Sequence, residues 1–239
     1  MYDSMFWSRN LKQGGRKRPL LVVMEEAHNY LGSDNYSRAS KVVRRLVKEF
    51  DDRGLRAAAG EAGLIETSLG IPFRTPAEGP NVLYTSLWDN YPTAATVPLT
   101  GRAMHAYLLL VGSTNHMQYD IANGAVSVRY ADGTRQRLEL VNPLNWAPVE
   151  QDFYFDEGAF RLAPGAQPPY RLHLQSGRVG RRLGDELGIE GVYGRQIDGG
   201  AATLVDLRLD PARDLEALEV ETLSNDVVIG LMAVTLQNE

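Results

Sequence analysis

Residues 81–118 read NVLYTSLWDNYPTAATVPLTGRAMHAYLLLVGSTNHMQ, and their apolar runs indicate the fold. Residues 104–111 form a strongly hydrophobic octet that is too short for a membrane span, which needs about 20 apolar residues. Because Gly101 and Gly112 bound this octet, we predict a strand that is buried on both faces. Residues 81–87 are predicted to form its partner strand.

The chain around this stretch also has the pattern of a β protein. The pairs Asn123-Gly124 and Asp132-Gly133 favour type I′ turns, which predicts a three-stranded antiparallel meander. The meander would consist of residues 117–122, 125–130 and 135–141. Further short strands are predicted at residues 64–67, 171–174, 203–209, 215–223 and 227–236, with a helical turn near 181–187. The last strand is apolar on both faces and is therefore expected inside its sheet. This spacing predicts a mainly β fold, a jelly-roll-like antiparallel β-sandwich.

The distribution of charge divides the chain of 239 residues into two parts. Residues 1–50 hold ten of the 25 Lys and Arg and five of the 30 acidic residues, so they carry +5 and residues 51–239 carry −10. All four lysines lie at or before Lys48. We therefore predict a domain boundary at Phe50/Asp51. The start at Met1 lacks a signal-peptide pattern, so the chain as written is expected in the cytoplasm.

The first part has the form of a Walker B element. A predicted strand at residues 19–24 runs into Glu25 and Glu26, and an amphipathic helix is predicted at residues 37–50. The sequences RPLLVVMEEAHNYL and ASKVVRRLVKE resemble the HerA-like P-loop ATPases, which drive DNA translocation as hexamers. This resemblance implies that Glu26 is the catalytic glutamate and that Glu25 is on the metal side. No G-x-x-x-x-G-K-[ST] motif is present to hold phosphates, so we expect an inactive remnant that does not bind nucleic acid.

Aromatic and polar residues gather in two predicted loops of the second part. A flat ring beside amide and carboxylate groups is the usual chemistry of a sugar site, because the ring packs C–H groups and the polar groups fix hydroxyls. The alternative is that these large aromatic rings close the open ends of the sandwich. The candidates for carbohydrate binding are Trp88, Asp89, Asn90, Tyr91, Asn145 and Trp146.

The residues predict no catalytic site. A glycosidase needs two carboxyl groups about 5–5.5 Å or 6.5–9.5 Å apart, which sequence cannot show. The acids at 150, 152, 156 and 157 are close in sequence but are also typical of a solvated loop. The four histidines lack zinc-binding spacing, and His105 is expected to be a core residue. No cysteine is present, and we expect neither a metal nor a cofactor.

Residues 51–237 resemble the C-terminal β-sandwich of large secreted bacterial glycosidase-like proteins with a six-hairpin barrel. The motifs that carry this resemblance are NVLYTSLWDNYP, VPLTGRAMHAYLLLVGSTNHMQ, NPLNWAPVEQDF and LEALEVETLSNDVVIGLMAVTL. The resemblance implies a non-catalytic, carbohydrate-associated accessory module whose partners are a polysaccharide or oligosaccharide and a lost catalytic barrel. It also implies a secreted or periplasmic parent. Two alternatives stay open: a component of a DNA translocase that contributes only Walker B residues, and a purely structural sandwich.

Overall fold

The computed structural model of the chain describes residues 63–76, 81–87, 91–154, 162–190 and 194–238, together with β1 (Lys12–Gln13) and β2 (Arg16–Lys17). The chain divides into two compact units, Met1–Ser37 and Arg38–Glu239. The antiparallel pair β1–β2 belongs to the first unit, and every element described below belongs to the second. The predicted strand at 19–24, helix at 37–50 and boundary at Phe50/Asp51 lie outside the described residues and stay predictions.

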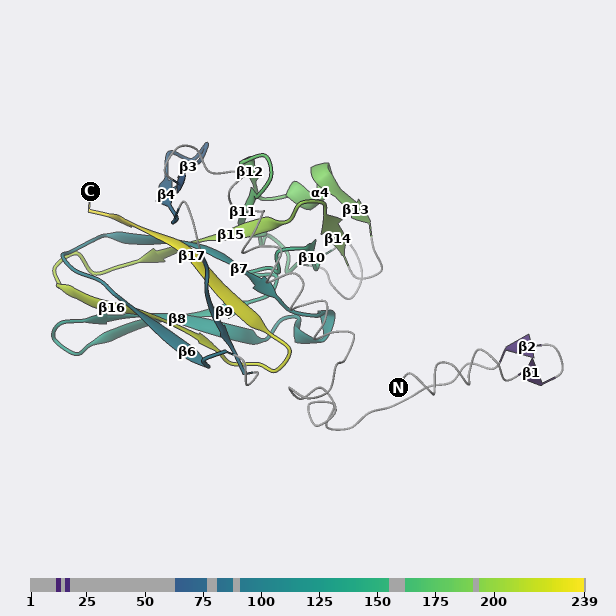
Figure 1. Ribbon diagram of the computed structural model, residues 1–239, viewed down its shortest axis with the longest axis horizontal. Helices are drawn as coiled ribbons and strands as arrows, with labels where there is room; N and C mark the ends of the chain where they lie inside the picture. Colours follow the sequence, from purple (N-terminus) through teal and green to yellow (C-terminus); the bar gives the residue numbers. More distant parts are fainter. Residues whose placement is uncertain are drawn as a thin grey trace. The chain divides into compact units, whose positions relative to one another are not determined.

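Two large antiparallel sheets make up most of the second unit, and Figure 1 shows them as two layers. The six-stranded sheet has the order β12 (Val179–Gly180), β11 (Tyr170–His173), β15 (Ala201–Arg208), β7 (His105–Ser113), β17 (Val228–Gln237) and β5 (Leu83–Ser86). The four-stranded sheet has the order β6 (Ala94–Pro98), β16 (Leu215–Thr222), β8 (Ala122–Tyr130) and β9 (Arg135–Val141). The predicted mainly β sandwich is confirmed.

The strand order is that of a jelly roll. The first half of the sandwich, β5 to β8, pairs in reverse order with the second half: β5 with β17, β6 with β16, β7 with β15 and β8 with β9. The chain alternates between the two sheets from β5 to β8 and again from β15 to β17, which is how a long hairpin wraps into a double-sheet jelly roll. As a consequence, the connections after β5, β7, β9 and β16 all lie at one end of the sandwich.

The apolar stretch at 104–111 lies in the middle of the six-stranded sheet, as β7. Leu108 and Leu110 face the core between the two sheets, where Val126 and Val128 of β8 meet them. Leu109 belongs to a second core on the opposite face of the sheet. That core is covered in part by Ile65 and Phe73, from the antiparallel pair of β3 (Leu64–Glu66) and β4 (Pro72–Arg74). The prediction of a strand buried on both faces is confirmed, and β17 is an interior strand, as expected.

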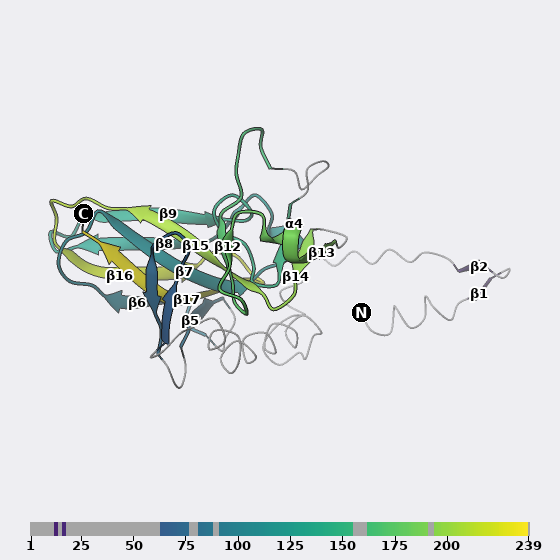
Figure 2. The ribbon, with the colours of Figure 1, turned by 90° about the horizontal axis from the view of Figure 1, so that it is seen from above.

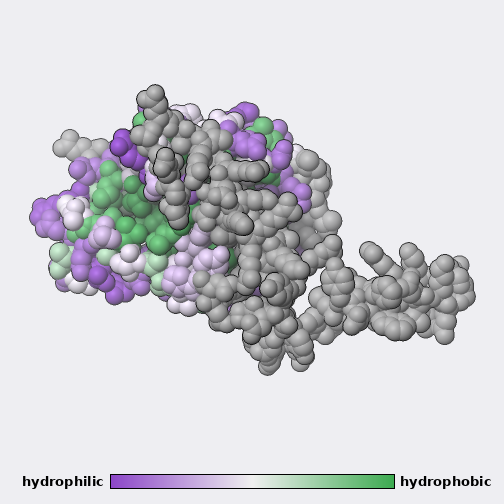
Figure 3. Space-filling model, viewed as in Figure 1, coloured by the Kyte–Doolittle hydropathy of each residue, from purple (hydrophilic) through white to green (hydrophobic). Residues whose placement is uncertain are grey.

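Partly buried apolar side chains continue to the surface on one side of the sandwich. Val97 and Leu99 of the β6 region and Val234 and Leu236 of β17 pack against the inter-sheet core. Figure 3 shows hydrophobic residues gathered on the described part of the face in view. The core between the sheets is therefore continuous with an apolar area at the molecular surface.

The predicted turn at Asn123-Gly124 is wrong. Both residues lie inside β8, and residues 117–121 form no strand: 117 and 118 belong to the short 3₁₀ helix η4 (His116–Gln118), and 119–121 lead from it into β8. A Cβ on Gly124 would lie 2.6 Å from the carbonyl oxygen of Glu221 and 3.0 Å from Cγ1 of Ile229. The glycine is therefore needed because another backbone approaches closely, not because the chain turns. The meander is reduced to the β8–β9 hairpin.

The second predicted turn is a real hairpin of a different type. A three-residue loop of residues 131–133 joins β8 to β9, and the Tyr130 amide bonds to the Thr134 carbonyl at 2.9 Å. Gly133 has a positive φ of 83°, whereas Asp132 does not, and a type I′ turn would need both. The other predicted strands are confirmed, with ends shifted by at most three residues.

A small additional sheet was not predicted. It has the order β10 (Gln151–Asp152), β14 (Arg195–Ile197) and β13 (Gly188–Glu190), and the short helix α4 (Leu183–Leu187) packs beside it. We call these elements the side sheet. They are part of the insertion between β9 and β15, and Figures 1 and 2 both show them at one end of the sandwich. Of these elements, the sequence had predicted only a helical turn near 181–187, where α4 lies.

Candidate functional site

The four connections after β5, β7, β9 and β16 are held together by hydrogen bonds, and we call this region the loop end. The Ser86 hydroxyl donates to the Val227 carbonyl at 2.9 Å, which joins the first loop to the last. The Leu223 amide donates to the carbonyl of Asn123 at 3.0 Å. The Asp120 amide donates to the carbonyl of Asn142 at 2.7 Å, which joins the second loop to the third. Both loops that carry the sugar-binding candidates therefore belong to this end.

The candidates in the first loop are only partly described. Trp88, Asp89 and Asn90 lie outside the described residues, as do Glu25 and Glu26 of the Walker B stretch. Tyr91 is half-buried, and its ring centroid lies 6.0 Å from that of Tyr84 at an interplanar angle of 59°. It packs against the second core, so one part of its ring serves the fold and another part stays accessible.

The candidates in the third loop have structural roles. The Oδ1 atom of Asn145 accepts from the Val141 amide and its Nδ2 donates to the Glu139 carbonyl, both at 2.8 Å. This amide therefore holds the end of β9. Trp146 has an exposed fraction of 0% and belongs to the core between the sheets. Its ring offers no face to a sugar here, and it closes the end of the sandwich, as the alternative interpretation expected.

Exposed aliphatic side chains gather at the same end. The described residues contain eight large hydrophobic residues that are exposed, and five of them lie in the loop-end connections. These five are Leu87, Met117, Ile121, Leu144 and Leu223, which we call the aliphatic set. Met117 is 75% exposed, the largest fraction among them. Aliphatic side chains pack on other apolar surfaces, whereas sugars favour flat aromatic rings.

A buried ion pair joins the side sheet to the sandwich. Arg171 of β11 is only 1% exposed, and its Nη1 lies 3.0 Å from Oδ1 of Asp152 on β10. Its Nη2 donates to the carbonyls of Pro148 at 2.5 Å and Ala201 at 2.9 Å. Burial is the main cause that raises the pKa of Asp152, and the charge of Arg171 opposes this rise. A single arginine thus binds the end of β10, the start of β15 and the segment before β10.

Glu150 lies two residues before Asp152 and is a second perturbed acid at this place. The residue keeps some exposed surface, but its Oε2 is buried without a hydrogen-bond partner. Its Oε1 accepts from the Ser113 hydroxyl at 3.3 Å. Burial raises the pKa of Glu150 to about 7, against smaller lowering effects from its own backbone amide, Ser113 and Arg171. A solvated loop was one expectation for these acids, and Glu150 and Asp152 do not follow it.

Sequence reasoning missed Arg171, although a signal for it exists. The strand reads YRLHL, and an arginine among residues that are expected to be buried must find a carboxylate or carbonyls. Which carboxylate it finds depends on a contact 19 residues away, between Asp152 and Arg171. The partner could not be read from local sequence.

Two of the described histidines, His105 and His173, have polar partners within the fold. His105 was expected in the core, but it is only half-buried. It begins β7, and its Nδ1 lies 2.7 Å from Asp206 Oδ1. His173 is buried, with its ring nitrogens 2.7 Å from the Ser176 hydroxyl and the Asp198 carbonyl. Across the residues that the structure describes, no group of three or more His, Asp or Glu side chains is placed to hold a metal ion. No helix in the described ranges has the length and apolar character needed to cross a bilayer.

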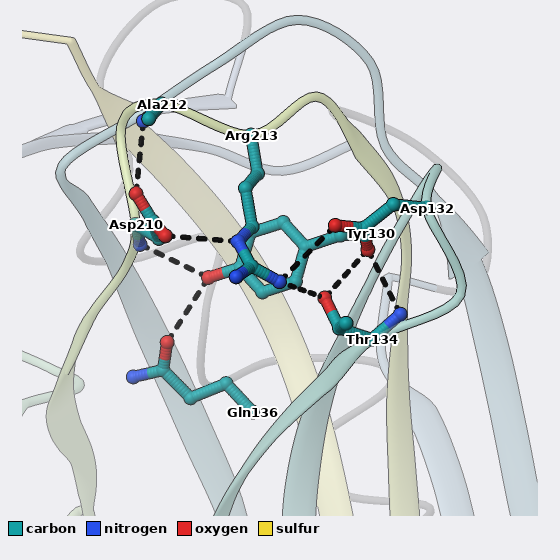
Figure 4. A network of polar contacts seen from close by, with 7 residues as sticks. All are labelled: Tyr130, Asp132, Thr134, Gln136, Asp210, Ala212 and Arg213. Atoms are coloured by element: carbon teal, nitrogen blue, oxygen red, sulfur yellow. Dashed lines mark hydrogen bonds and ion pairs between the residues drawn. The ribbon is translucent and has the colours of Figure 1, made fainter.

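The opposite end of the sandwich carries the polar network drawn in Figure 4, and we call it the stapled end. Arg213 Nε donates to Asp210 at 2.9 Å, and its Nη1 donates to Asp132 at 3.1 Å and to the Thr134 hydroxyl at 2.5 Å. The Tyr130 hydroxyl accepts from the Asp210 amide and donates to Gln136, both at 3.0 Å. Hydrogen bonds from Thr134 are the largest cause that lowers the pKa of Asp132. The network therefore ties the β8–β9 turn to the β15–β16 turn.

No protein-family model, curated protein or solved structure matches this chain. The two resemblances stated from the sequence therefore stay predictions. The function has to be argued from the two ends of the sandwich.

Proposed function

We propose that residues 51–239 form a non-catalytic, carbohydrate-associated sandwich module that contacts its polysaccharide or oligosaccharide through the loop end. The observation that carries the proposal is the jelly-roll strand order. It gathers the loop that holds Trp88, Asp89, Asn90 and Tyr91 beside the loop that holds Asn145. Since Trp146 is buried and Asn145 is engaged with the backbone, the contact rests on the first loop.

Tryptophan fluorescence of the full chain tests this proposal against a panel of plant and bacterial polysaccharides. The chain has three tryptophans, at positions 7, 88 and 146, and Trp146 is buried. We expect a saturable spectral shift that persists in a Trp7→Phe control and is lost in Trp88→Ala. A protein that is folded by circular dichroism and shows no shift with any glycan would overturn the proposal.

A second candidate function is supported by the aliphatic set. Five exposed aliphatic residues at one end favour contact with another protein domain, so the module would act as a purely structural sandwich. Sedimentation and binding of a hydrophobic dye test this alternative. Replacing Met117 and Leu144 with Asp should abolish concentration-dependent association or dye binding. The exposed Leu69, outside the loop end, provides a matched Leu69→Asp control.

The DNA-translocase alternative rests on residues 1–50. Here the expected partner is an intact ATPase whose site Glu26 would complete. Residual ATP hydrolysis that disappears in Glu26→Gln would favour this alternative. Hydrolysis that is absent from the purified chain, together with glycan binding, would favour the sandwich module.

A further inference from the structure

Backbone hydrogen bonds around Glu150 join the side sheet to the sandwich. The Val149 amide donates to the Gly112 carbonyl of β7 at 2.9 Å, and the Ala201 amide donates to the Val149 carbonyl at 2.8 Å. The Ile197 amide donates to the carbonyl of Glu150 itself at 2.9 Å. The chain therefore first enters the side sheet and last leaves it through two adjacent segments, and Glu150 lies where these segments meet the sandwich.

The backbones at this junction are packed without room for adjustment. A Cβ on Gly194 would lie 1.9 Å from the Asp152 carbonyl oxygen, and one on Gly184 would lie 2.8 Å from Asp152 Oδ2. At Gly112, which has a φ of 152°, a Cβ would lie 1.9 Å from the Val228 carbonyl oxygen. A change of charge at Glu150 therefore cannot be absorbed by small local shifts and must act on the junction as a whole.

The charged groups around the junction leave Glu150 with the weakest compensation. Arg171 of β11 has its ion pair with Asp152 and its two backbone carbonyls. Around Asp152, Arg195 of β14 adds a positive charge and Asp185 of α4 a negative one, and these two lie 3.2 Å apart. Among the described residues, the Ser113 hydroxyl at the end of β7 donates a side-chain hydrogen bond to Glu150. Ionised Glu150 thus has its own backbone amide, one hydroxyl donor, the more distant charge of Arg171 and a buried oxygen without a donor.

We propose that proton binding at Glu150 locks the side sheet onto the loop end of the sandwich and that proton release loosens this junction. Burial raises the pKa of Glu150 to about 7, whereas the rise that burial causes at Asp152 is opposed by the charge of its partner Arg171. A closed junction then binds a proton that an open, solvated one releases. The closed state is favoured in mild acid, and it loses this advantage as pH rises toward about 7.

Hydrogen exchange of the full chain measures this switch directly. The reporters are the amides of Val149, Ile197 and Ala201, whose hydrogen bonds cross the junction, with the Val128 amide in the centre of β8 as internal reference. After correction for the intrinsic exchange rate, opening should increase about tenfold per pH unit between pH 5 and 7, as expected for release of one proton. It should level off above that range. The reference amide should show no such increase.

Glu150→Gln is the decisive variant, because glutamine keeps the shape of the protonated acid but cannot titrate. Its junction amides should stay protected up to pH 8.5, and the pH slope should vanish. Glu139→Gln, on the exposed part of β9, is the matched control and should keep the wild-type slope. A wild-type slope in Glu150→Gln would overturn the proposal by assigning the proton elsewhere, with Asp152 as the first suspect.

A second measurement covers the case in which the variant does not fold. Carbon-13 spectra of wild-type protein labelled at glutamate carboxyls follow the titration without any substitution. One carboxyl should titrate near pH 7, in step with the opening of the junction amides. Absence of a glutamate that titrates above pH 6 in the folded protein would overturn the proposal.

Discussion

The two ends of the sandwich use charge in opposite ways. At the stapled end Arg213 contacts Asp132, Asp210 and Thr134, and the side chains of this arginine and both acids are 41–50% exposed. At the loop end Arg171 makes a similar number of polar contacts while 1% exposed. Water screens the first network, whereas the second has replaced water altogether. The two arginines make similar contacts, but losing the contacts of buried Arg171 should cost more free energy of unfolding than losing those of exposed Arg213.

The two ends also differ in how completely their polar groups are satisfied. Among the described residues, the buried polar atoms without a hydrogen-bond partner include Thr114 Oγ1, Asn142 Oδ1 and Nδ2, Trp146 Nε1 and Glu150 Oε2. All of these belong to the loop end or the junction beside it. No side-chain atom of the network in Figure 4 is among them. The polar side chains of the stapled-end network are thus satisfied by hydrogen bonds. The loop end combines buried polar atoms that lack partners with exposed aliphatic residues, and functional surfaces have these features.

The largest expected effect is that of Arg171→Leu. This change leaves Asp152 buried without its counter-charge and leaves two carbonyls without a donor, so the protein should lose about 3–5 kcal/mol of its free energy of unfolding. Urea denaturation followed by circular dichroism measures the loss. Arg213→Leu is the matched control at the stapled end and should shift the urea midpoint far less. Equal losses in the two variants would contradict the comparison.

The double variant Arg171→Leu/Asp152→Asn sharpens this result. Removing the buried carboxylate together with its partner should recover part of the loss, because an unpaired buried charge is the main cost. No recovery would mean that the carbonyls of Pro148 and Ala201, not the ion pair, account for the role of Arg171.

The strand framework could be predicted because its signals are local. The octet at 104–111 is apolar at every side chain that a doubly covered strand must bury, and the Asp132-Gly133 pair marks a turn that needs only its own residues. The turn prediction at Asn123-Gly124 was wrong because Gly124 is required by the close approach of Glu221 and Ile229, about a hundred residues away. A local motif predicts a turn only where no distant backbone needs the same glycine.

The candidate site was less predictable than the fold for a related reason. Trp146 and Asn145 stand in a Pro-rich stretch that is typical of a surface loop, yet the tryptophan is at 0% exposure. Whether a loop aromatic faces water or closes a core depends on how the two sheets end, which is a property of the whole sandwich. The junction of Glu150, Asp152 and Arg171 depends in the same way on the pairing of β11 with β15.

Tyr130→Phe should give an intermediate effect at the stapled end. The side chain is 3% exposed, and its hydroxyl accepts from the Asp210 amide and donates to Gln136. Removing the hydroxyl leaves that amide without its acceptor, so the free energy of unfolding should fall by about 1–2 kcal/mol. Thermal and urea unfolding measure the fall. A larger loss than in Arg171→Leu would reverse the proposed order of the two ends.

The smallest expected effect concerns acid, and it separates the two ends by its sign. Hydrogen bonds from Thr134 lower the pKa of Asp132, so this carboxylate stabilises the fold above its unfolded pKa, and that contribution is lost as pH falls through the lower folded value. Asp132→Asn should therefore flatten the decline in unfolding free energy below about pH 4 and leave the range from pH 5 to 7 unchanged. Glu150→Gln should change the unfolding free energy between pH 5 and 7 and leave its decline below about pH 4 unchanged.

Unfolding midpoints of both variants over pH 2–8 test this. Addition of 1 M NaCl should reduce the Asp132 effect more than the Glu150 effect, because salt screens exposed charges more than buried ones. Variants that shift the same part of the pH profile would show that the two ends are coupled, and the sandwich would then respond to protons as a single unit.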